Sequence, residues 1–334
     1  MARRRSTVPK RHCVACLLAL SVGSAGQLLA AAPSTPAPRP GATPAATAPA
    51  PAENTGFHDE VAVGFVLVPA VVRTRSGYVN DLKKNDFHVF VDGKPVTVES
   101  FDRGTDAPVS LVFLQDLSGS MGIAEKLDAS REAVRYFLDQ QKPGDQFALA
   151  SFSGDLVQVD VPFTNDPQPL REAVSAWEAS GTTALNDAVA WLPEITAEQM
   201  SFKRAAILIT DGVDNRSTMT PEQAREAVRK AELPVYVLGE DGKKVWRLAD
   251  TLNLLAVLTG GRYYPVNGPY DMKEACAAIA EDLRHQYVLG FSTSNAGTPG
   301  YHSLRVEVAG RSRTVMFRRG YRGGPPLAAA APAK

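Results

Sequence analysis

The sequence predicts an α/β protein with a doubly wound, mostly parallel sheet that is inserted in, or flanked by, a small all-β domain of the sandwich type. Three observations lead to this fold class. Apolar runs that suit strands alternate with amphipathic stretches that suit helices over residues 109–284. The runs at 109–115 and 205–210 are continuously apolar, which is typical of strands buried on both faces of a parallel sheet. Short alternating segments lie on both sides of this region, at 57–104 and 286–322.

The elements of the α/β region follow from the same patterns. Two paired strands are expected around the turn Gly154-Asp155, and the apolar stripe from Ile123 to Leu138 predicts an amphipathic helix. The helix over 184–192 is expected to end at Pro193, and Thr220 is expected to cap the start of another helix. The expected strands are 109–115, 145–153, 156–163, 205–210, 235–239 and 262–265, and the expected helices are 122–141, 170–177, 184–192, one from 220, 248–259 and 271–284.

The two flanking β segments are expected to form one domain. Segment 57–104 contains a strand-like run at 61–72 and a hairpin around the turn Asp92-Gly-Lys. Segment 286–322 contains alternating runs at 286–291, 303–308 and 313–318. Each segment alone has few apolar residues for a core, so we expect the two to pair and the domain over 105–285 to be inserted between them.

Charge and cysteine content exclude two classes of protein. The 334 residues include 36 Lys and Arg and 36 Asp and Glu, which argues against a polybasic nucleic-acid binder. Three cysteines are too few for a disulfide scaffold, and two of them, Cys13 and Cys16, lie in the N-terminal segment. Cys276 lies in an apolar, helix-like stretch, which predicts a buried packing residue and not a reactive thiol.

The N-terminal region is expected to direct export. Residues 1–31 combine basic residues, an apolar core and small residues, which is the pattern of a signal peptide, although an uncleaved anchor stays open. Residues 32–56 are rich in Pro and Ala and predict a disordered linker, and 323–334 predict a disordered tail. We therefore expect an exported protein, periplasmic or secreted, of a bacterial envelope.

Oxygen-bearing side chains cluster where two of the expected strands end. Asp116, Ser118 and Ser120 follow the strand 109–115, and Asp211 follows the strand 205–210. A loop with two adjacent threonines, 180–185, precedes a helix between them. Two carboxylates and three hydroxyls form a hard ligand set, which favours Mg²⁺ or another small divalent cation over Zn²⁺. Such neutral hydroxyl ligands leave charge on the ion and an open position that a partner's carboxylate could fill.

These motifs resemble the metal-ion-dependent adhesion site of von Willebrand factor type A domains. The resemblance covers roughly 105–285 and includes the flanking stretches Gly144-Asp-Gln-Phe-Ala-Leu and Gly181-Thr-Thr-Ala-Leu-Asn-Asp. It implies a Rossmann-like sheet with a metal, Mg²⁺ or another divalent cation such as Mn²⁺ or Ca²⁺, at its top. The residues that it implies as metal ligands are Asp116, Ser118, Ser120, Thr183 and Asp211. The β segments are similar to those of bacterial exported proteins related to this family, which extends the resemblance to about 57–322.

The predicted function is that of an exported, metal-dependent protein-binding module for adhesion or assembly, without enzymatic activity. Its partner is expected to supply an Asp or Glu to the metal; nucleic acid is not expected, and a membrane only through an uncleaved signal segment. A hydrolase or phosphotransferase that uses Asp116 or Ser120 is an alternative, although Ser118 stands where a second aspartate is usual and no motif places a histidine. A structural envelope scaffold with a vestigial metal site, in which Asp116 merely caps a helix, is another.

Overall fold

The structure is a computed structural model, and it describes residues 64–103, 107–197, 203–212, 214–240, 246–293 and 298–324, with only the backbone of 246–248. All of them belong to the second of the two units into which the chain divides, His58–Lys334. The predicted signal peptide over 1–31 and linker over 32–56 lie outside the described residues. So does the predicted tail, except for its first residues: Gly323 is the last residue of the final strand.

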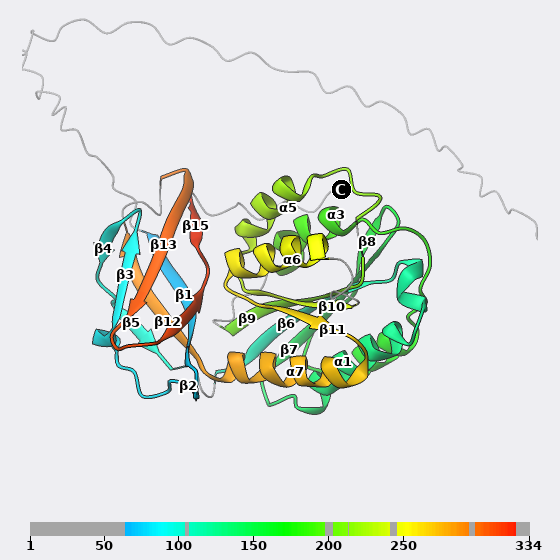
Figure 1. The fold of residues 1–334 in the computed structure, drawn as a ribbon, viewed down its shortest axis with the longest axis horizontal. Helices are drawn as coiled ribbons and strands as arrows, with labels where there is room; N and C mark the ends of the chain where they lie inside the picture. Colours follow the sequence, from blue (N-terminus) through cyan, green and yellow to red (C-terminus); the bar gives the residue numbers. More distant parts are fainter. Residues whose placement is uncertain are drawn as a thin grey trace, which may run out of the picture. The chain divides into compact units, whose positions relative to one another are not determined.

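The central sheet of the described residues has six strands in the order β11-β10-β9-β6-β7-β8 (Figure 1). All of them run parallel except β8, which pairs antiparallel with β7 at one edge. The middle strand β6 is almost wholly buried, as its continuous apolar run predicts. The strands are β6 (Val109–Asp116), β7 (Gln146–Ser153), β8 (Leu156–Thr164), β9 (Lys203–Thr210), β10 (Val235–Glu240) and β11 (Tyr263–Val266).

Helices cover both faces of this sheet (Figure 1). On one face, Phe113 of the sheet packs with Phe137 of α1 and Ile279 of α7 in one apolar core. On the other face, Leu114 of the same strand packs with Val189 of α3 in a second core. The helices are α1 (Lys126–Asp139), α2 (Pro167–Ser175), α3 (Leu185–Ala190), α4 (Leu192–Thr196), α5 (Pro221–Val228), α6 (Trp246–Thr259) and α7 (Pro269–Arg284), with short 3-10 turns at η1 (Lys84–Asp86), η2 (Gly119–Gly122) and η3 (Arg229–Ala231).

A second part of the protein is a β-sandwich. One antiparallel sheet has the order β14-β1-β12-β5 with β2 on β1, the other has the order β15-β13-β3-β4, and both contribute to a third apolar core. β1 pairs with β12 and β3 with β13, so strands from before and after the α/β region lie side by side in each sheet. The strands are β1 (Gly64–Thr74), β2 (Gly77–Tyr78), β3 (Phe87–Val91), β4 (Lys94–Val96), β5 (Ser100–Asp102), β12 (Gln286–Thr293), β13 (Gly300–Val308), β14 (Thr314–Phe317) and β15 (Gly320–Gly323). The predicted fold class, an α/β sheet with a small all-β domain, is confirmed.

The start of the first long helix differs from the prediction over 122–141. α1 begins only at Lys126. The two residues before it, Ala124 and Glu125, have φ angles of 57° and 61°. This left-handed conformation is rare for residues other than glycine, and it breaks the helical path between the 3-10 turn η2 and α1.

The position of Pro193 differs from the prediction. Pro193 does not end the helical stretch as predicted, because α3 already ends at Ala190 and Pro193 lies in the first turn of α4. Residues in a first turn need no intrahelical N–H bond, so proline is tolerated there.

Cys276 is fully buried in α7, and this burial raises the pKa of its thiol to about 12. The prediction of a packing residue therefore agrees with its surroundings.

Buried polar contacts connect the sandwich to the α/β part. The guanidinium of Arg318, which is only 4% exposed, forms an ion pair with Glu232 at 2.8 Å. The neighbouring N–H of Arg319 donates to the carbonyl of Leu258 at the end of α6. Tyr78 of β2 donates its hydroxyl hydrogen to Asp282 of α7 at 2.8 Å. These contacts fix β2 and the residues after β14 to the α/β part.

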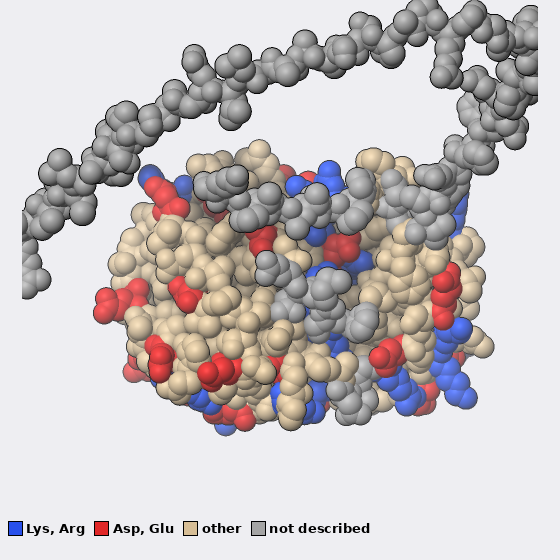
Figure 2. Space-filling model, turned by 180° about the vertical axis from the view of Figure 1, so that it is seen from behind, with Lys and Arg blue, Asp and Glu red and all other residues tan. Residues whose placement is uncertain are grey.

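The surface offers no broad patch of one charge on the face drawn in Figure 2. There acidic and basic side chains are interspersed among uncharged ones, in keeping with the equal numbers of the two signs in the sequence. Among the described helices, none combines the length and the apolar character needed to cross a membrane.

Candidate metal centre

The predicted site residues lie at the carboxyl edge of the central sheet. β6 ends at Asp116, and Asp211 follows the last residue of β9, the strand paired with β6. β7 pairs with the other side of β6, so the strand order changes direction at β6. Such a switch point leaves a crevice between the loops that leave neighbouring strands. Ligands of doubly wound proteins bind at this place, which is where the sequence predicted the site.

The loop after β6 folds its three oxygen-bearing side chains into one cluster. The N–H of Ser118 donates to Asp116 Oδ1 at 2.8 Å, which bends the chain directly after the strand. The hydroxyls of Ser118 and Ser120 are 3.1 Å apart. The N–H of Gly119 donates to the carbonyl of Gly181 at 3.0 Å, so the threonine-containing loop is held against this one.

Thr183 and Asp116 approach each other across Gly212. A Cβ atom built on Gly212 would lie 3.0 Å from Asp116 Oδ2, 3.3 Å from Thr183 Oγ1 and 2.7 Å from Thr183 Cγ2. The absence of a side chain at this position therefore lets the two oxygens face the same space. Thr183 is buried, whereas the adjacent Thr182 is exposed. Of the two threonines, Thr183 is therefore the one that is placed among the other oxygens.

Asp211 has a hydrogen-bonding partner on each carboxylate oxygen. The hydroxyl of Ser120 donates to Oδ1 at 2.7 Å. The ammonium of Lys126 lies 2.5 Å from Oδ2, and the side chains of Lys126 and Asp211 are 10% and 2% exposed. Lys126 is a residue that the sequence interpretation did not single out, because it lay within a helix predicted to start before it.

Asp116 is fully buried and is held by a further residue that the sequence interpretation missed. Thr210 donates its hydroxyl hydrogen to Asp116 Oδ2 at 2.6 Å and accepts the N–H of Gly212 at 3.0 Å. Burial raises the pKa of the Asp116 carboxyl, while its hydrogen bonds from Thr210 and Ser118 oppose this rise. The nearby charge of Asp211 raises the pKa further. Burial therefore disfavours the charged form of Asp116 more than its hydrogen bonds favour it.

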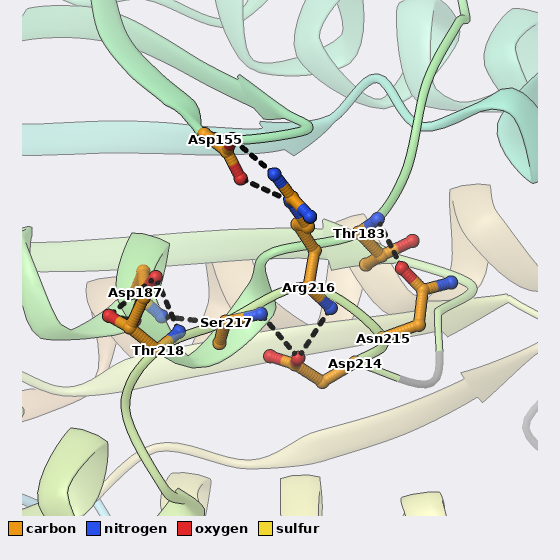
Figure 3. Close-up of polar contacts among 8 residues, drawn as sticks. All are labelled: Asp155, Thr183, Asp187, Asp214, Asn215, Arg216, Ser217 and Thr218. Atoms are coloured by element: carbon orange, nitrogen blue, oxygen red, sulfur yellow. Dashed lines mark hydrogen bonds and ion pairs between the residues drawn. The ribbon is translucent and has the colours of Figure 1, made fainter.

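A network of polar contacts holds the outer loops in place (Figure 3). Asn215 accepts the N–H of Thr183 at 2.9 Å. Asp214 accepts the N–H of Asn186 at 2.8 Å. Asp187 accepts the N–H groups of Thr218 and Met219, each at 2.9 Å. These bonds run between the start of α3 and the loop after β9. Asp214 and Asp187 therefore position the loops through backbone amides, as capping groups do.

An ion pair connects this network to the turn between β7 and β8. The guanidinium of Arg216 contacts both carboxylate oxygens of Asp155, at 2.5 and 2.7 Å (Figure 3). Both side chains are largely exposed, so solvent screens the ion pair and it contributes little to stability. The hydrogen bonds from Arg216 lower the pKa of Asp155.

The chemistry of the donors fits a hard divalent cation. Within the described ranges, no group of three or more His, Cys, Asp and Glu side chains is arranged to hold a metal. The candidate centre instead combines two carboxylates, of Asp116 and Asp211, with hydroxyls of Ser118, Ser120 and Thr183. Oxygen donors of this kind suit Mg²⁺, Mn²⁺ or Ca²⁺ and do not suit Zn²⁺. The full burial of the Asp116 carboxyl is the second feature that fits a cation.

Two solved structures resemble the chain at low sequence identity. A von Willebrand factor type A structure from Catenulispora acidiphila is 16% identical, covers 78% of this chain and 73% of that one, and has a TM-score of 0.44. The von Willebrand factor domain of the type V pili tip protein Mfa5 from Porphyromonas gingivalis is 13% identical, with coverage of 52% and 94% and a TM-score of 0.44.

Sequence comparison gives a more specific result. Inter-alpha-trypsin inhibitor heavy chain H3 from Pongo abelii is 32% identical over 152 residues, which are 40% of this chain and 17% of the relative. Heavy chain H1 from Sus scrofa is 28% identical over 233 residues, which are 60% of this chain and 25% of the relative. The chain thus spans a quarter or less of the length of these relatives. Residues 111–213, which include all five candidate ligands, match the family model of the von Willebrand factor type A domain, and this region of the chain is therefore identified as a von Willebrand factor type A domain.

Proposed function

We propose that this protein is an exported protein-binding module that holds a divalent cation, Mg²⁺ in the first place, and has no enzymatic activity. The family generally mediates protein–protein interaction or adhesion. The observation that carries the proposal is the convergence of five side-chain oxygen donors from three separate loops at one edge of the sheet. The ligands would be Asp116, Ser118, Ser120, Thr183 and Asp211.

Each part of the chain has a defined task in this proposal. The bound ion would supply a positive charge with an open position for an Asp or Glu of the partner. Asp116 provides a fixed, buried negative charge, and Thr210 holds its orientation. The bonds from Asn215 and Asp214 hold the start of α3, and with it Thr183, against the loop after β9.

The geometry favours binding over catalysis. Among the described residues, the Ser120 hydroxyl is hydrogen-bonded to Ser118 and Asp211, and neither is a histidine of the kind that activates serine nucleophiles. His285 and His302 are hydrogen-bonded to Glu281 and Asp92 outside this centre. These hydrogen bonds support a centre that binds a ligand and does not catalyse a reaction.

Calorimetric titration of the full chain with Mg²⁺ tests the proposal. We expect one saturable site in the wild type, and its loss in Asp116→Ala, because that change removes the buried carboxylate. Asp155→Ala is the matched control, since it removes an exposed carboxylate of the same edge and should leave binding unchanged. Circular dichroism establishes that both variants are folded. Equal Mg²⁺ binding by Asp116→Ala and wild type would contradict the proposed centre.

The partner is tested separately. Immobilised protein should capture its partner from a cell-envelope extract in Mg²⁺ and release it in a chelator, and Asp116→Ala should capture nothing. Capture that persists unchanged in the chelator would contradict a metal-mediated interaction and would favour the surface of the sandwich as the binding site.

A further inference from the structure

Lys126 is placed unusually for the first residue of a helix. A positive charge at a helix N-terminus lies next to the positive end of the helix dipole, which is unfavourable. The two residues before it, Ala124 and Glu125, adopt the left-handed conformation at φ 57° and 61°, which costs energy for both. Its stem is buried, and its ammonium is directed to Asp211. The start of α1 is thus unfavourable in backbone conformation and in charge, and the same lysine makes a close contact with Asp211 at the candidate metal centre.

The contact compensates charge within the centre. Asp116 and Asp211 bring two carboxylates into a mostly buried space, and Lys126 brings one positive charge to it. Without a metal, these three side chains leave a net charge of about −1 instead of −2. A folded site with two unpaired buried carboxylates would be costly, so the lysine stabilises the arrangement of the loops before any ion binds.

The same contact competes with a metal ion. The Asp211 oxygen that faces Lys126 accepts an N–H bond at 2.5 Å, and the other oxygen accepts the Ser120 hydroxyl. A hydroxyl can turn its hydrogen away and present a lone pair to an ion, but an ammonium has three donors and no lone pair. A divalent cation next to Asp211 therefore also meets the charge of Lys126, and the two positive charges repel each other.

We propose that Lys126 is a built-in counter-ion of Asp211 that a divalent cation must displace, so that it keeps the metal-free site assembled and lowers its affinity for the ion. This inference rests on the proposed function. It makes the binding of metal and partner dependent on each other, because a partner's carboxylate would supply the negative charge that lets the ion compete with the lysine. Lys126 is a positioning residue that sets how readily the centre is filled.

The test is the affinity of the full chain for Mg²⁺ and for Mn²⁺ in Lys126→Met, Lys126→Gln and Lys126→Arg. Removal of the charge in the first two variants should tighten both dissociation constants by about tenfold or more. Lys126→Arg keeps the charge and should stay close to the wild type. Lys142→Met, which removes an exposed lysine from the loop before β7, controls for net charge. Lys126→Gln replaces Lys126→Met if the latter does not fold.

A second measurement separates competition from a purely structural role. In a chelator, Lys126→Met should melt at a lower temperature than the wild type, and saturating Mg²⁺ should raise its melting temperature more than that of the wild type. Unchanged or weaker metal affinity in both uncharged variants, with a normal wild-type site, would overturn the inference and leave the proposed function intact. Absence of metal binding in every variant would overturn both, whereas binding only after removal of the lysine charge would support both.

Discussion

Thr210 shows how one hydroxyl can determine the arrangement of the site. It donates to the buried carboxylate of Asp116 and accepts from the N–H of Gly212, so it bonds one residue from each of two loops. Serine and threonine often stabilise turns in this way, and the sequence Thr210-Asp-Gly gave no sign that the acceptor would be Asp116. The bond therefore belongs to the tertiary structure, because its two ends are 94 residues apart.

Replacement of Thr210 by valine keeps the shape of the side chain and removes both bonds. It leaves the N–H of Gly212 without this acceptor and Asp116 with one donor fewer in a buried place, so we expect a loss of about 2 kcal/mol in the free energy of unfolding. Urea denaturation measures it. Thr196→Val is the matched control: its buried hydroxyl donates to the carbonyl of Leu192 within the same helical stretch, and its loss should cost less. Equal losses in the two variants would contradict the role of Thr210.

At the scale of elements, the loop after β9 and the start of α3 behave as one unit. The carboxylate of Asp214 accepts the N–H groups of Arg216 and Ser217 at 3.2 and 3.0 Å (Figure 3). It also accepts the N–H of Asn186 at 2.8 Å, so a single side chain organises both segments. Thr183 lies at the centre of this unit, with its own N–H bonded to Asn215. The position of Thr183 thus depends on residues that would not touch an ion.

The change Asp214→Ala should loosen this unit. Three backbone N–H groups lose their acceptor, and we expect a loss of about 1–2 kcal/mol of stability. Amide hydrogen exchange should become faster over 183–187 and 214–219, and exchange in the central strands should change no more than the global loss of stability requires. Asp155→Ala, which removes the exposed ion-pair partner of Arg216, should have little effect on stability. Unchanged exchange over both segments would contradict the prediction.

The sequence predicted elements better than the contacts between their ends. β6 and β9 were predictable because both are continuously apolar, and their order placed Asp116 and Asp211 at one edge of a parallel sheet. The contact of Lys126 with Asp211 was not predictable, because it depends on the left-handed residues Ala124 and Glu125, which delay the start of α1. Neither residue is a glycine, so no sequence signal marked the turn.

At the scale of the whole second unit, buried polar groups join the sandwich to the α/β part. Asp282 of α7 accepts the hydroxyl hydrogen of Tyr78 at 2.8 Å, and Arg73 of β1 lies 3.7 Å from the same oxygen. The other oxygen of Asp282 is buried and has no hydrogen-bond partner among the described residues, and the same holds for the hydroxyl of Tyr236. A charge is therefore buried where the two parts meet, with incomplete compensation.

This arrangement predicts how stability depends on pH. Burial raises the pKa of Asp282 above its ordinary value near ~4, although Arg262, Tyr78 and Arg73 oppose the rise. Below pH ~4, Asp282 is protonated in both the folded and the unfolded chain, and burial of its charge costs nothing. As the pH rises from ~4 toward the raised pKa, the unfolded chain is ionised while the folded chain keeps its proton, so this residue makes the folded state progressively less stable until both states are ionised.

Asp282→Asn removes the charge and retains an acceptor for Tyr78, so it should remove this contribution. We expect the free energy of unfolding of the variant minus that of the wild type to increase from about pH 4 upward and then to level off above the raised pKa. Urea denaturation of both proteins at a series of pH values gives this difference, in which the other titrating groups cancel. A difference that stays constant with pH would show that the charge of Asp282 is fully compensated when folded. The stability of the contact between the sandwich and the α/β part would then depend on the packing of Tyr78 and on the Arg318–Glu232 ion pair, and not on the ionisation of Asp282.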